Sequence, residues 1–213
     1  MSEKNKTELE LLEDFIVNAF VDRKQKSGVE PIWKHSMRVG KQCMDFISKL
    51  NLDNDKMKYV GYVHDILHDT KTTEQELAKN LSSIFEIPEN DKRISEIVDV
   101  CKKMNRDRNQ EVSEFLVYIK NTNDDVLYIV KTIEMNDKLK MAIKNYTSFK
   151  ERWNYCIVNS KKFVVPMLES KIKEYDDSDK RSIFSELKFF FERAIDDSEF
   201  NFDNLFCLPT KRK

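Results

Sequence analysis

The chain has 213 residues, of which 40% are hydrophobic and 35% charged, a composition that predicts a globular protein with a substantial core. Its 37 basic and 38 acidic residues give a net charge of -1, so no overall field favours nucleic acid or a membrane surface. The sequence shows neither the apolar region of a signal peptide nor an apolar stretch of about 18 residues that could span a membrane. We therefore expect a location in the reducing cytoplasm.

Turn-forming residues are scarce, with three glycines and four prolines. A sheet protein with many hairpins would need more of both, so the composition predicts an all-α fold. The same scarcity excludes a glycine-rich phosphate-binding loop. The cysteines have no Cys-x-x-Cys spacing, which predicts free thiols rather than a zinc ribbon or a redox pair.

The first half of the chain predicts four amphipathic helices. Thr7 and Glu10 form a possible capping box for a helix that ends near residue 22. After a loop at 24–31, a second helix is expected over 32–50, with His35 in its first turns. A third, over 56–68, is apolar on most faces and is therefore predicted to be the buried central helix. Thr72 or Thr73, with Glu76, begins a fourth helix that ends near residue 85.

The second half predicts helices over 93–104, 111–121, 124–146 and 148–174, and Pro166 is expected to kink or break the last. A polar linker at 176–179 precedes a helix with an apolar stripe from residue 183 to 195. We expect one helical domain over 1–175. Residues 176–213 would form a C-terminal helical extension packed on the same unit, or on a second subunit in a homodimer.

The chemistry concentrates in a His-Asp-Ile-Leu-His-Asp run at 64–69, which holds two of the three histidines of the chain. On a continuous helix His64 and His68 would share a face, and so would Asp65 and Asp69. A single His-Asp pair would favour a hydrogen-bonded pair in the core. Four such groups on a buried helix favour a functional site. Burial of each polar side chain costs free energy and requires a hydrogen-bond partner, and a purely structural role would give nothing in return.

Two metal sites fit this run. In a zinc protease, histidines four apart bind the metal and a glutamate between them is the base, but here Asp65 is one methylene short of that glutamate. In the other, His64 and Asp65 are adjacent ligands, joined by a histidine from an earlier helix and a carboxylate from a later one. Imidazoles and carboxylates without a thiolate suit Mn²⁺, Fe²⁺, Co²⁺, Ni²⁺ or Zn²⁺ better than Ca²⁺.

At this point the sequence resembles the HD superfamily of metal-dependent phosphohydrolases, whose pattern is a lone His, then His-Asp, then a distant Asp. The resemblance implies an HD-domain helical bundle with additional C-terminal helices and Mn²⁺ as the expected metal. It also implies four metal ligands, namely His35, His64, Asp65 and Asp137. Glu134 lies one turn before Asp137 and is the alternative fourth ligand.

Within that superfamily the chain resembles RelA/SpoT-type alarmone hydrolases, which remove pyrophosphate from the 3′ position of guanosine tetra- or pentaphosphate. Residues 25–35, Gln-Lys-Ser-Gly-Val-Glu-Pro-Ile-Trp-Lys-His, are similar to their first motif, Arg-Lys-Ser-Gly-Glu-Pro-Tyr-x-x-His. Residues 64–70 are similar to their His-Asp-x-x-Glu-Asp-Thr motif. The chain departs from the family at Gln25, His68 and Met141, where the family has Arg, Glu and Asn.

The resemblance implies a role for each part of the site. His68 or Asp69 would take a proton or orient the attacking water. Lys26, Ser27 and Lys138 would bind the substrate phosphates. We therefore expect a metal-dependent phosphohydrolase acting on a phosphorylated nucleotide, with guanosine tetra- or pentaphosphate as the candidate substrate.

Two alternatives remain open beside this function. The first is an HD-type nucleotidase or nucleoside triphosphate hydrolase of other specificity. The second is a degenerate regulatory protein that binds a nucleotide without cutting it. Nucleic-acid binding ranks below both, because the basic cluster at 102–108 is short and partly acidic.

Overall fold

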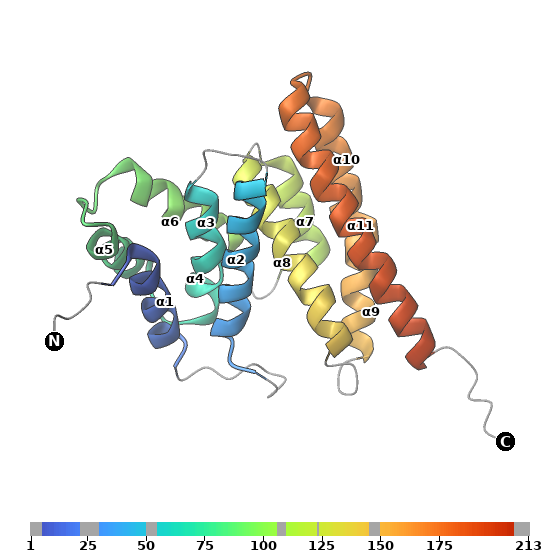
Figure 1. Ribbon diagram of the computed structural model, residues 1–213, viewed down its shortest axis with the longest axis horizontal. Helices are drawn as coiled ribbons and strands as arrows, with labels where there is room; N and C mark the ends of the chain where they lie inside the picture. The colour runs from blue at the N-terminus through green and yellow to red at the C-terminus, as the bar shows by residue number, and fades with distance from the viewer. Residues whose placement is uncertain are drawn as a thin grey trace. The chain divides into compact units, whose positions relative to one another are not determined.

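The computed structural model describes residues 6–21, 30–49, 55–105, 110–122, 124–144 and 150–206, and within these ranges the chain forms helices and no β-strand (Figure 1). The all-α prediction is confirmed. The chain divides into two compact units, the first made of Met1–Asn109 and Asp124–Val130 and the second of Gln110–Asn123 and Lys131–Lys213. The boundary expected near residue 176 falls inside the second unit and stays a prediction. None of the described helices is long and apolar enough to cross a membrane.

The first unit contains three of the four predicted metal ligands, His35, His64 and Asp65. Thr7 and Thr73 cap α1 and α5 through capping boxes with Glu10 and Glu76, as the sequence predicts. The helices are α1 (Glu8–Ala19), α2 (Trp33–Lys49), α3 (Asp55–Val63), α4 (Ile66–Asp69), α5 (Glu74–Phe85), α6 (Lys92–Met104) and the beginning of α8 (Asp125–Lys144).

Two glycines let α2 and α3 approach each other closely. A Cβ on Gly40 would lie 2.3 Å from the ring of Tyr62, and a Cβ on Gly61 would lie 2.7 Å from Sγ of Cys43 and 3.1 Å from Cα of Gly40. Only a residue without a side chain fits at either position. Since α2 carries His35 and α3 leads directly into His64, this crossing sets the spacing of the two histidines.

The helix predicted over 56–68 is interrupted near its C-terminal end, and the prediction of one continuous helix was wrong. α3 ends at Val63, His64 and Asp65 form a turn, and α4 begins at Ile66. The backbone N–H of His68 donates to the carbonyl of Asp65 at 3.1 Å, a three-residue step in place of the four-residue step of an α-helix. The rest of the prediction is confirmed, because α3 is buried along most of its length.

The second unit contains the helix in which Pro166 was expected to cause a break. The region predicted as one helix over 148–174 divides just before that proline, which has no N–H and clashes with the carbonyl four residues earlier. A π-helical turn takes up the irregularity. The elements are α7 (Val112–Asn121), the remainder of α8, α9 (Lys150–Asn159), the π-helix η2 (Ser160–Val164), α10 (Val165–Glu174) and α11 (Ser178–Phe206).

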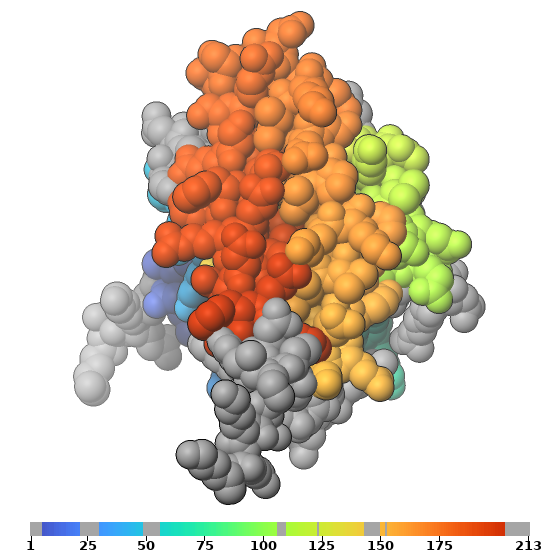
Figure 2. Space-filling model, turned by 90° about the vertical axis from the view of Figure 1, so that its right-hand side faces the viewer, coloured from blue at the N-terminus to red at the C-terminus, as the bar shows by residue number. Residues whose placement is uncertain are grey.

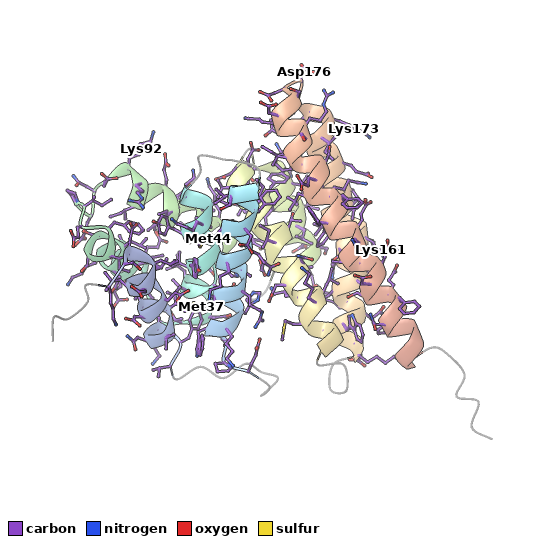
Figure 3. All side chains as sticks on the ribbon, in the orientation of Figure 1. Met37, Met44, Lys92, Lys161, Lys173 and Asp176 are labelled. Carbon is purple, nitrogen blue, oxygen red and sulfur yellow. The ribbon has the colours of Figure 1, made fainter. Side chains whose placement is uncertain are left out.

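Helices α10 and α11 lie side by side within this unit (Figure 2). The turn between them carries Asp176, at the tip labelled in Figure 3. Of the predicted apolar stripe on α11, Leu187 and Phe191 are buried, whereas Phe190 is 41% exposed. The apolar stripe is thus buried in part. A homodimer through the C-terminal helices stays a prediction.

Candidate metal centre

His64 is held in one orientation by the last turn of α3. Its Nδ1 lies 2.8 Å from the carbonyl oxygen of Gly61. A carbonyl only accepts hydrogen bonds, so Nδ1 carries the proton and donates it. Nε2 of the neutral ring then holds the lone pair, which is the arrangement of a histidine prepared to bind a metal.

His35 enters the site from the first turns of α2. Its backbone N–H donates to the carbonyl of Ile32 at 3.0 Å, and Oε1 of Glu30 forms an ion pair with Nη2 of Arg38 at 2.7 Å. These contacts fix the start of the helix. The rings of His35 and His64 meet edge to face, with centroids 5.3 Å apart and planes at 76°.

The carboxylate of Asp65 lies beside both imidazoles. Its Oδ2 is 3.1 Å from Nε2 of His64 and 3.6 Å from Nε2 of His35. Asp65 is the first residue before α4, yet its side chain makes no capping hydrogen bond to that helix. Because the predicted helix is interrupted here, the carboxylate of Asp65 lies next to the two imidazoles. On a continuous helix it would point about 100° away from His64.

These separations fit a set of atoms that share one metal ion. Two ligand atoms bound at the usual Zn–N or Zn–O distance in a tetrahedral arrangement lie about 3.4 Å apart, and the observed 3.1 and 3.6 Å bracket that value. The side chain of His64 is fully buried and that of Asp65 is 19% exposed. The side chains are two imidazoles and one carboxylate, a combination that suits a divalent transition metal.

His68 and Asp69 form a separate pair. Nδ1 of His68 lies 2.8 Å from Oδ1 of Asp69, and the two side chains are 31% and 35% exposed. The sequence predicted one face with two imidazoles and another with two carboxylates, and the break before α4 replaces that arrangement. The structure instead pairs His64 with Asp65 and His68 with Asp69.

The two carboxylates expected to supply the distant ligand, Glu134 and Asp137, lie on α8 and are each 2% exposed. Lys131 donates to Oε2 of Glu134 at 2.7 Å, and Lys138 donates to its Oε1. Lys138, expected to bind substrate phosphate, thus contacts a candidate metal ligand. Lys131 flanks the third motif, as Lys138 does, and was a lesser candidate for binding phosphate; its spacing of three residues before Glu134 is the signal that identifies the contact.

The thiols nearest this region are kept protonated. Burial, and then the negative charge of Asp65, raise the pKa of the Cys101 thiol, and burial raises the pKa of Cys43. A thiol in the protonated form is a poor metal ligand. Cys43 and Cys101 are free thiols, as predicted, and Cys207 lies outside the described residues.

Lys26 and Ser27, the residues of the first motif that were expected to bind phosphate, lie outside the described residues.

No model of a protein family matches the chain, and no curated protein matches it either.

Proposed function

We propose that this protein is an HD-type metal-dependent phosphohydrolase that acts on a phosphorylated nucleotide. The observation that carries the proposal is the position of Oδ2 of Asp65 within 3.6 Å of Nε2 of both His35 and His64. These three residues are the lone His and the His-Asp pair of the HD pattern. They come from α2 and from the turn after α3.

A carboxylate from α8 completes the proposed ligand set. We propose Glu134 as that ligand, with Asp137, one turn later on the same helix, as the alternative; both side chains are buried. The expected metal is Mn²⁺, with Fe²⁺, Co²⁺, Ni²⁺ and Zn²⁺ as alternatives that the same donors accept.

A divalent metal ion held there would polarise a phosphoryl oxygen and lower the pKa of a water ligand toward about 7. The residues around it have separate tasks in the proposal. Gly61 fixes the tautomer of His64 through its carbonyl oxygen. The paired side chains of His68 and Asp69 reach solvent, so they can accept a proton from the attacking water and release it. Lys26 and Ser27 remain the proposed phosphate-binding residues, and guanosine tetraphosphate is the first candidate substrate.

The first test measures metal binding by the full chain after treatment with a chelator. His64→Ala and Asp65→Ala should each lower the affinity for Mn²⁺ by at least about 100-fold, because loss of a direct ligand exceeds the effect of losing an outer hydrogen bond. The matched control is His68→Ala, which removes a histidine four residues away and should keep the affinity of the wild type. Unchanged binding in the two ligand variants would exclude this site.

The reaction is tested with the same variants. With Mn²⁺ the wild type should release pyrophosphate from guanosine tetraphosphate, and His64→Ala and Asp65→Ala should abolish the release. Orthophosphate or triphosphate from a panel of nucleotides would keep the reaction class and change the substrate. Metal binding without hydrolysis of any nucleotide would argue against an enzyme and for a regulatory protein.

A further inference from the structure

Glu134 carries a cation on each of its two carboxylate oxygens. Lys131 contacts Oε2 at 2.7 Å, and Lys138 contacts Oε1. The lysines stand three residues before and four residues after Glu134, the two spacings at which side chains on one helix meet. A carboxylate that is 2% exposed is thereby neutralised from within its own helix.

The two lysines differ in their access to water. The side chain of Lys131 is 9% exposed, and its ammonium lies 5.1 Å from the ring centroid of Phe115, within range of a cation–π contact. The side chain of Lys138 is 35% exposed. A long side chain near the surface can move its charge into water by changing rotamer, whereas a buried ammonium loses solvation and partners when it moves. Lys138 is therefore the cation that can leave Glu134.

A metal ion and an ammonium group that contact the same carboxylate oxygen lie close together and repel each other. Lys131 and Lys138 already contact the two oxygens of the Glu134 carboxylate. A divalent ion added there would also bring two further positive charges next to two ammonium groups. Binding through Glu134 is thus an exchange of cations.

We propose that Lys138 is a built-in counterion of Glu134 that a divalent metal ion displaces from Oε1. In the metal-free protein it stabilises the buried carboxylate, and by competing for that oxygen it lowers the affinity for the metal. Lys131 stays in place and holds Oε2. This inference rests on the proposed function, in which Glu134 is a metal ligand.

The test is a calorimetric titration of Mn²⁺ into the chelator-treated full chain. Lys138→Met should bind Mn²⁺ about fivefold more tightly than the wild type, the factor expected when an ion pair of about 1 kcal/mol no longer competes. Lys138→Arg keeps the cation and should keep the wild-type affinity. The matched control is Lys140→Met, which removes an exposed lysine two residues away on α8 and should also bind like the wild type.

Equal or weaker binding by Lys138→Met would overturn the displacement while leaving the metal site in place. A wild type that binds no Mn²⁺ would overturn both the displacement and the proposed function. A second measurement needs no variant: acetylation of lysines, followed by peptide mass spectrometry, should label Lys138 faster when Mn²⁺ is present, with Lys140 as the internal reference. Labelling of Lys138 at the same rate with and without Mn²⁺ would contradict the proposal.

Discussion

A single residue, Gly61, serves the candidate site in two ways. Its carbonyl oxygen orients His64 from 2.8 Å, and its missing side chain lets α3 pack against α2. A glycine inside a helix normally lowers stability relative to alanine by about 1 kcal/mol. Here that cost is offset by the approach of the two helices that carry His35 and His64.

Gly61→Ala should therefore destabilise the protein, although replacing a glycine by alanine inside a helix usually stabilises it. Its Cβ would lie 2.7 Å from Sγ of Cys43, and overpacking of this kind costs about 1–3 kcal/mol. Chemical denaturation measures the change. The double variant Gly61→Ala with Cys43→Ala removes the obstructing sulfur. Its loss of unfolding free energy should be smaller than the sum of the losses in the two single variants. Ser48→Ala, at an exposed position on α2, is the control and should change little.

At the scale of the helices, short local signals decide where each element begins. In the capping box of α5, Oε2 of Glu76 accepts from the backbone N–H of Thr73 at 2.8 Å and from its hydroxyl at 2.9 Å. Hydrogen bonds from that backbone N–H and then from the hydroxyl hold the pKa of Glu76 below its usual range. This cap fixes the start of the helix that follows the His-Asp motif.

The stability contributed by Glu76 should depend on pH. Because its pKa is lower in the folded than in the unfolded chain, its contribution is present above the unfolded value and is lost as the pH falls through the folded value. Glu76→Gln should thus lower the melting temperature at neutral pH, and the difference from the wild type should shrink in acid. Glu89→Gln, in an exposed turn, should show no such dependence. A difference that stays constant with pH would contradict the role of the carboxylate.

The sequence predicted helices best where the signal is local. The capping boxes at Thr7 and Thr73 and the break at Pro166 depend on residues within one turn, and all three are confirmed. The turn at His64 and Asp65 was missed because the apolar periodicity continues through it into α4. That break depends on how the buried histidine packs, and no spacing of residues along the chain reveals such a contact.

The candidate site was predictable as residue types and less so as geometry. The spacing of His35 and the His64-Asp65 pair indicated three side chains for one site. In the structure Oδ2 of Asp65 lies within 3.6 Å of Nε2 of both histidines. The sequence left open which carboxylate of α8 would be the fourth metal ligand, because Glu134 and Asp137 are one turn apart. Lys131 and Lys138 contact Glu134, and these contacts are visible only in the structure.

The whole molecule has two compact units, and the chain passes between them more than once. Residues 110–123 belong to the second unit, residues 124–130 to the first, and residues from 131 onward to the second again. Helix α8 therefore contributes to both. The hydrophobic pattern along the sequence could not reveal this division, since α8 reads as one uninterrupted helix.

The two tryptophans of the chain report on different units, which makes the cooperativity of folding measurable. Trp33 begins α2 in the first unit, and the buried Trp153 of the second donates from Nε1 to Oγ of Ser198 at 3.3 Å. Trp153→Phe leaves only the first probe, and Trp33→Phe leaves only the second. Units with separate cores can unfold in separate transitions.

We expect a destabilising change in one unit to move mainly the transition of its own tryptophan. In denaturant titrations followed by fluorescence, Gly61→Ala should shift the Trp33 midpoint. Leu168→Ala removes a fully buried side chain of the second unit and should shift the Trp153 midpoint by the equivalent of about 2–5 kcal/mol. Each variant is compared with its own single-tryptophan parent, which removes the effect of the phenylalanine. Equal shifts of both probes by either variant would mean that the shared helix α8 couples the units into one cooperative fold.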